Sequence, residues 1–358
     1  STLVSATQVQ VSLPASDFAT AGALQISVRN PTPGGGLSES VPFVVAGDAP
    51  KLISEVTSPS LGATALAADP TRPLIYVALP STATAQPNTV VALDVGSGSI
   101  VWSVPIAGSP NVLAISDDGQ FLYVGQRHDP NIVRITLATH SPDLIIPLGS
   151  PSYYTSVIAV SPGNPRTIAV GREINNVWPS NVGVTIYDDS VPRPQSTPGH
   201  DYPSSFVFGG SPSLIYGYNG TSSSFEFYTI GIDATGATNE AVKQNVLSSY
   251  GRSLVYASSK IYASDGSVID PGTQSVVGHL AGFNVSASLV PSSDGQVIYT
   301  ADAAGTVIAA DARTYAPPGS VAVSDASGGA SSIVRWGQNG IAFIANGKVF
   351  VVRADFIR

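Results

Sequence analysis

Two acidic runs in this sequence carry residue types that bind divalent cations. Asp117, Asp118 and Gly119 stand in the segment SDDGQFLYV, and Asp294 and Gly295 stand in SSDGQVIYT. Calcium requires about six to eight oxygen ligands, several of them from carboxylates. The same runs are also typical of a tight turn between two strands, because Asp and Gly favour turn conformations. The choice between a cation site and a turn depends on what recurs elsewhere in the chain.

The other chemistry-bearing residue types lack the spacing of a reactive site. The four histidines, at positions 128, 140, 200 and 279, show neither HxH nor HxxxH spacing, which favours structural roles over metal binding. There is no cysteine and no GxSxG motif, so no nucleophile is indicated. The glycine-rich runs at 34–36 and 96–98 precede no helix, which argues against a dinucleotide site. The sequence predicts no catalytic residue, no metal and no cofactor.

Composition restricts the partners and the location. The 358 residues carry a net charge of −8, and lysine occurs only at positions 51, 243, 260 and 348, so nucleic acid is not an expected partner. No run of about 18 apolar residues could span a membrane. Scarce Lys, abundant Ser and Thr and absent Cys resemble bacterial secreted proteins. With no methionine either, we expect an extracellular or cell-surface protein whose signal and upstream region are absent from this chain.

One pattern recurs seven times between residues 65 and 344: an apolar strand, a short polar turn and a second strand with an apolar or aromatic centre. Examples are AISDDGQFLYVG (114–125) and LVPSSDGQVIYT (289–300). A period in the forties with several strands per unit is typical of a β-propeller blade. The aligned positions, spaced by 40 to 47 residues, are Tyr76, Tyr123, Ala169, Tyr216, Tyr256, Tyr299 and Phe343.

The repeat assigns the acidic runs to turns. Residues 117–119 lie between the first and second strands of a unit, where other units carry Pro-Thr-Arg, Gly-Asn-Pro, Ser-Pro-Ser or Gln-Asn-Gly. These residues share turn propensity and no ligand chemistry. We therefore predict that Asp117, Asp118 and Asp294 bind no metal.

The last unit is short of a strand. Seven units account for residues 51–358, but the seventh has strands only near 331–335, 341–345 and 348–353. An open sheet edge invites aggregation, so something must pair with it. The segment KLISEVTS (51–58) precedes the first unit and belongs to no hairpin of its own. We predict that it is the outer strand of the last blade and closes a ring over residues 51–358.

Residues 1–50 do not follow the repeat. Alternating strands are expected at 7–14, 23–31 and 40–47, a spacing suited to an immunoglobulin-like sandwich. The run VSLPASDFATAGALQISVRNPTPGGGLSESVPFVV resembles the second half of a bacterial IPT/TIG domain, and the LYV and IYV strands of the repeat resemble YVTN/lactonase-like propellers. The expected fold is all-β, a seven-bladed β-propeller preceded by a partial immunoglobulin-like β-sandwich.

The least repetitive residues fall in loops that emerge on one face of such a propeller. Exposed aromatic side chains beside Arg, Asp and His suit stacking on a sugar ring or anchoring a protein. Packing of these aromatics between blades is the structural alternative. The candidate binding residues are Arg127, His128, Tyr153, Tyr154, Arg172, Glu173, Trp178, His200, Asp201 and Tyr202, with Asp129 beside them.

The resulting hypothesis is a non-enzymatic extracellular protein that acts in binding, adhesion or structural assembly, with a protein or glycan partner at the propeller loop face. One alternative is a lactonase-like or other propeller hydrolase, because propeller sites converge from distant positions that no motif reveals. A second alternative is a filament subunit. In that case strands from another copy complete the immunoglobulin-like segment.

Overall fold

The structure, a computed structural model, describes residues 2–5, 7–14, 16, 22–31, 33–38, 41–45, 50–175, 177, 180–198, 203–283, 288–317 and 319–358. Within these residues all regular structure is β-strand with turns, and no α-helix occurs. The same residues contain no helix long and apolar enough to cross a membrane. The chain divides into two compact units, Ser1–Pro50 and Lys51–Arg358.

The first unit contains two separate two-stranded sheets. Strand β1 (Thr2–Ser5) pairs with β2 (Gln8–Gln10), and β3 (Gly22–Ile26) pairs with β4 (Val41–Val45). The sequence predicted no strand at β1, and of the strand expected at 7–14 only Gln8–Gln10 is regular. Apolar side chains in these hairpins are largely exposed, with Leu3 at 73% and Leu37 at 70%. The immunoglobulin-like sandwich stays a prediction.

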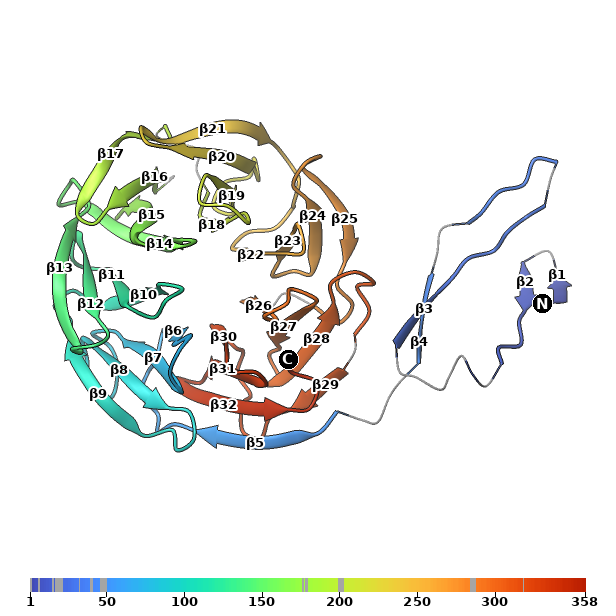
Figure 1. Cartoon of the computed structure of the whole chain (residues 1–358), viewed down its shortest axis with the longest axis horizontal. Helices are drawn as coiled ribbons and strands as arrows, with labels where there is room; N and C mark the ends of the chain where they lie inside the picture. Colours follow the sequence, from blue (N-terminus) through green and yellow to red (C-terminus); the bar gives the residue numbers. More distant parts are fainter. Residues whose placement is uncertain are drawn as a thin grey trace. The chain divides into compact units, whose positions relative to one another are not determined.

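The second unit is a propeller-like ring of antiparallel sheets (Figure 1). In Figure 1 the first strand of each sheet lies toward the centre and the last lies on the rim. Three four-stranded sheets follow the chain order. They are β6 (Ala65–Ala68), β7 (Leu74–Leu79), β8 (Thr89–Asp94) and β9 (Ile100–Pro105); β10 (Pro110–Ile115), β11 (Phe121–Gln126), β12 (Asn131–Thr136) and β13 (Ser141–Pro147); and β22 (Leu254–Ala257), β23 (Lys260–Ala263), β24 (Ser267–Asp270) and β25 (Ser275–His279).

One larger sheet has eight strands. Its two halves join at their rim strands, β17 and β21, through the single parallel pair Gln195↔Gly236. One half is β14 (Tyr153–Ser161), β15 (Asn164–Ile174), β16 (Asn181–Asp188) and β17 (Val191–Ser196); the other is β18 (Ser205–Phe208), β19 (Leu214–Tyr218), β20 (Phe227–Asp233) and β21 (Gly236–Lys243).

The last two sheets close the ring. One is β26 (Leu289–Pro291), β27 (Val297–Ala301), β28 (Thr306–Asp311) and β29 (Gly319–Ala322), and the other is β30 (Ile333–Trp336), β31 (Gly340–Ala345) and β32 (Lys348–Ala354) with β5 (Leu52–Thr57). Strand β5 pairs antiparallel with β32, from Thr57 opposite Phe350 to Leu52 opposite Ala354. The rim strand of the last sheet therefore comes from the start of the second unit.

The hydrophobic core is divided into clusters between neighbouring sheets, each of which we call a seam. In an antiparallel strand, alternate side chains point to opposite faces, so each inner strand supplies two seams. In β15, for example, Ile168 and Val170 face the β10–β13 sheet, whereas Ala169 faces the β18–β21 half. The ring is thus held together by apolar contacts between sheets, with no cysteine present to bridge them.

Two of the aligned repeat positions were wrong. Tyr256 lies in the first strand of its sheet, because Ser258 and Ser259 both adopt positive φ and form a two-residue turn to β23. The second strand is therefore Lys260–Ala263, and Tyr262 is the equivalent residue. Phe343 lies in the second strand but faces the preceding sheet, so that Ala342 faces the next seam. A turn of serines, without Gly or Asn, hid the first shift.

Candidate binding cleft

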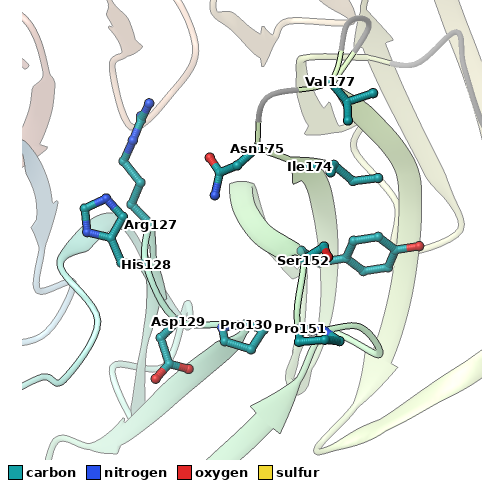
Figure 2. Close-up of a pocket in the computed structure, with 10 residues that line it drawn as sticks. Arg127, His128, Asp129, Pro130, Pro151, Ser152, Ile174, Asn175 and Val177 are labelled. Atoms are coloured by element: carbon teal, nitrogen blue, oxygen red, sulfur yellow. The ribbon is translucent and has the colours of Figure 1, made fainter.

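Three loops of the ring enclose a cleft of about 400 Å³ (Figure 2). Its walls are residues 127–130 after β11, 151–153 before β14, and 174–177 after β15, excluding Asn176. Strands β11 and β15 are both second strands of their sheets, so their carboxyl ends lie on one face of the ring. The antiparallel order of the strands therefore brings these loops together.

Three of the predicted residues line this cleft: Arg127, His128 and Tyr153. Arg127 and His128 project from one side in Figure 2, and Asn175 extends from the opposite side. The first two side chains are exposed, and Tyr153 is half-buried. Among the residues described, no acidic side chain lies within ion-pair distance of Arg127 or His128. Both remain able to contact a ligand.

Tyr154 and Glu173 stand behind the cleft, and neither lines it. They are paired across β14 and β15, and the Tyr154 hydroxyl donates to Glu173 Oε2 at 2.5 Å. The Arg127 guanidinium lies 5.8 Å from the centre of the Tyr154 ring. Burial, together with the neighbouring Glu173 carboxylate, raises the pKa of Tyr154 to about 12. Tyr154 therefore stays a neutral donor and helps to support Arg127.

Arg172 also supports the cleft from behind. Its guanidinium lies 5.1 Å from the centre of the Tyr153 ring, and Nη1 donates to the Leu148 carbonyl at 3.3 Å. Leu148 follows the rim strand of the neighbouring sheet, so this contact crosses the seam. Arg172 thereby holds Tyr153 in place and leaves only part of the ring open to solvent.

The remaining predicted residues, Trp178, His200, Asp201 and Tyr202, lie outside the described part of the chain. Sequence reasoning missed Ser152, Asn175 and Val177, which line the cleft. Their one available signal was position, because Ser152 precedes Tyr153 and the other two share a loop with Trp178. Short polar and aliphatic side chains carry no recognition pattern of their own.

The cleft offers a mixture of hydrogen-bonding groups and aromatic surface. Arg127 and His128 can donate, and Ser152 and Asn175 can both donate and accept. Asp129 is partly engaged, because its Oδ1 accepts a hydrogen bond from Asn131 Nδ2 at 2.5 Å. Within the described residues, no three His, Asp or Glu side chains come together as a metal-ligand set. The arrangement can hold a polar ligand that also presents an apolar face.

The acidic runs and the other described histidines have contacts of their own. Asp118 accepts hydrogen bonds from Ser116 Oγ at 2.7 Å and Gln120 N at 3.0 Å, and Asp294 makes the equivalent pair of contacts. His140 stacks on Trp102 across a seam, with ring centres 4.8 Å apart. These side chains hold turns and seams and do not reach the cleft.

The chain was compared with known families, curated proteins and solved structures. It matches no known protein family and no curated protein. Hydrazine synthase from Kuenenia stuttgartiensis is similar in structure, with a TM-score of 0.62 over 83% of this chain and 97% of the other, at 14% sequence identity. Solved structures that match number 1539 chains, so the likeness singles out no activity. At this level of identity it shows the fold alone, an all-β propeller-like ring of sheets.

Proposed function

We propose that this chain is a non-enzymatic extracellular binding protein that presents the cleft between β11, β14 and β15 to a glycan. The observation that carries the proposal is the cleft itself. It combines a partly exposed tyrosine with the unpaired cations Arg127 and His128 and the short polar side chains Ser152 and Asn175. Sugars are bound by an aromatic face together with several hydrogen-bonding groups around it. A concave site of this volume suits a small ligand better than a broad protein interface.

The scaffold in this proposal is a seven-bladed propeller of the YVTN/lactonase-like type, preceded by the second half of an IPT/TIG domain. The eight-stranded sheet counts as two blades, because one residue pair alone joins β17 to β21. With the five four-stranded sheets this gives seven. The sequence repeat supports the same number. Attachment at the cell surface and a role in adhesion follow as part of the proposal.

A glycan array tests the binding function. Wild type is expected to select a restricted set of glycans, and Arg127→Ala should weaken the affinity for them about tenfold through loss of a charge-assisted hydrogen bond. Arg313→Ala is the matched control, because Arg313 is exposed on the turn after β28, at the opposite face. Equal loss in both variants, or no selected glycan, would contradict the proposal. A protein captured through Arg127 would replace the glycan by a protein partner.

Self-assembly through residues 1–50 is a second candidate function. It is favoured by the exposed apolar side chains of the two hairpins, including Val41 at 66% exposure beside Leu3 and Leu37. Two-stranded hairpins gain stability by adding strands from another copy. Sedimentation at several concentrations should then show association that Leu3→Asp and Val41→Asp together abolish. A monomer at all concentrations removes this candidate.

A further inference from the structure

Second-strand tyrosines connect neighbouring sheets around the ring. The Tyr123 hydroxyl donates to the Pro165 carbonyl at 2.7 Å, and the Tyr262 hydroxyl donates to the Ala312 carbonyl at 3.0 Å. In each case the ring is fully buried and the acceptor belongs to the next sheet. Tyr299 makes the same kind of contact with the segment after β32. At these seams a phenol ring fills the space and its hydroxyl finds a carbonyl.

The β14–β17 half lacks this tyrosine. Its equivalent residue is Ala169, which packs in the seam toward the β18–β21 half with Ile186, Phe208 and Ile232. Alanine leaves most of a phenol ring's volume vacant, and it has no hydroxyl to donate. The last sheet also carries an alanine, Ala342, but there the indole of Trp336 is buried in the same seam and occupies the space.

A second cleft, of about 340 Å³, opens at the Ala169 seam. Ile186, Phe208 and Ile232 form its apolar walls, and Pro212 and Ser213 lie at its edge. These last two residues belong to the turn between β18 and β19, which lies on the face opposite the Arg127 loops. The cleft is therefore independent of the first one.

The hydrogen-bond acceptor expected for a phenol is also present. Pro212 stands four residues before Tyr216, as Pro165, the acceptor for Tyr123, stands four residues before Ala169. No hydrogen bond from a described residue to the Pro212 carbonyl is present. The nearby cation is already satisfied, because Arg193 pairs with Asp188 at 2.8 Å and donates to the Asp233 carbonyl at 2.6 Å. The site therefore suits a neutral ligand and not an anion.

We propose that this second cleft binds a small neutral phenol, whose ring lies against Ile186, Phe208 and Ile232 and whose hydroxyl donates to the Pro212 carbonyl. The ligand takes the place that a tyrosine occupies at the seams of Tyr123 and Tyr262. A buried apolar wall supplies the affinity, and the single carbonyl acceptor favours phenols over plain arenes.

Thermal unfolding with p-cresol tests this site. Wild type should gain a few degrees in Tm in a saturable manner, with a smaller gain from toluene, which lacks the hydroxyl. Ala169→Tyr should fill the cleft and abolish the response. The matched variant Tyr123→Ala should lower Tm and acquire a new response to p-cresol at its own seam. A p-cresol response that Ala169→Tyr leaves unchanged would overturn the proposal.

A second measurement does not depend on how these variants fold. In isoleucine-labelled wild type, the methyl resonances of Ile186 and Ile232 should shift with p-cresol, while those of Ile132 and Ile146 in the neighbouring seam should not. Ala234→Trp, at the exposed rim of the cleft, should reduce these shifts by narrowing the entrance. Shifts spread evenly over all four isoleucines, or absent from Ile186 and Ile232, would refute specific binding.

Discussion

Arg134 shows how a single buried side chain ties two sheets together. It is only 4% exposed, and its guanidinium pairs with Asp143 at 2.6 Å and also with Asp189 in the neighbouring sheet. The same group lies 4.2 Å from the centre of the Phe121 ring. Nothing in the sequence marked this arginine, because its two partners stand 9 and 55 residues away.

Replacing Arg134 by methionine should lower the free energy of unfolding by about 2 to 3 kcal/mol. Two carboxylates lose their partner, although both are partly exposed and can be solvated, so the cost is below that of a fully buried pair. Chemical denaturation of Arg134→Met and of Arg313→Met, whose side chain is exposed, measures the difference. A loss no larger than that of Arg313→Met would contradict the structural role.

Asp69 gives a pH dependence at the same scale. Burial raises the pKa of this carboxyl group, but hydrogen bonds from Tyr76, Thr71 and Arg72 outweigh it and bring the pKa below 3.8. A lowered folded-state pKa stabilises the protein above the ordinary value, and this contribution is lost as the pH falls through the folded-state pKa. The stability difference between wild type and Asp69→Asn should therefore be constant above about pH 5 and shrink below about pH 4. A difference that grows on acidification would reverse this assignment.

Strand β5 matters most at the scale of elements. It supplies the rim of the last sheet, and it also connects the two ends of the ring's chain, since β32 lies near the C-terminus. The Lys51 backbone N–H donates to Asp355 Oδ1 at 2.9 Å, which adds a contact at the same junction. Without β5, the edge of β32 would be open to solvent.

Two truncated chains test this closure. A chain beginning at residue 51 should keep the thermal stability of the ring, whereas one beginning at residue 59 should lose about 10 °C in Tm or fail to fold. The expected loss arises from five residue pairs of the β5–β32 ladder. Circular dichroism melts of the two proteins measure it. Equal melting temperatures would show that β5 contributes little to the ring.

The sequence predicted the strand-rich fold and many strand positions, because turn residues and apolar alternation recur at a regular period. The placement of 51–58 beside the last three strands followed from an edge-pairing argument, and β5 pairs with β32 in the structure. Tyr256 was misplaced because a two-serine turn carries no turn signature. Half of the cleft could not be foreseen, since Ser152 and Asn175 are ordinary loop residues whose proximity depends on the sheets' positions in the ring.

At the scale of the whole molecule, the propeller-like ring of the second unit presents two independent clefts on opposite faces. One is lined by polar and aromatic loop residues, including Arg127 and Tyr153, and the other is an apolar gap at Ala169. Rigid sheets fix the positions of both, so binding at either is expected to require little rearrangement. The proposed extracellular function rests on the first cleft.

Hydrogen exchange of the full chain, with and without the glycan selected on the array, tests that claim most directly. The account predicts slower exchange in residues 127–130, 151–153 and 174–177, with Arg313 and its turn unchanged. Arg127→Ala should remove this protection at the same glycan concentration. Protection confined to residues 1–50, or to the opposite face of the ring, would contradict the assignment of the cleft as the binding site.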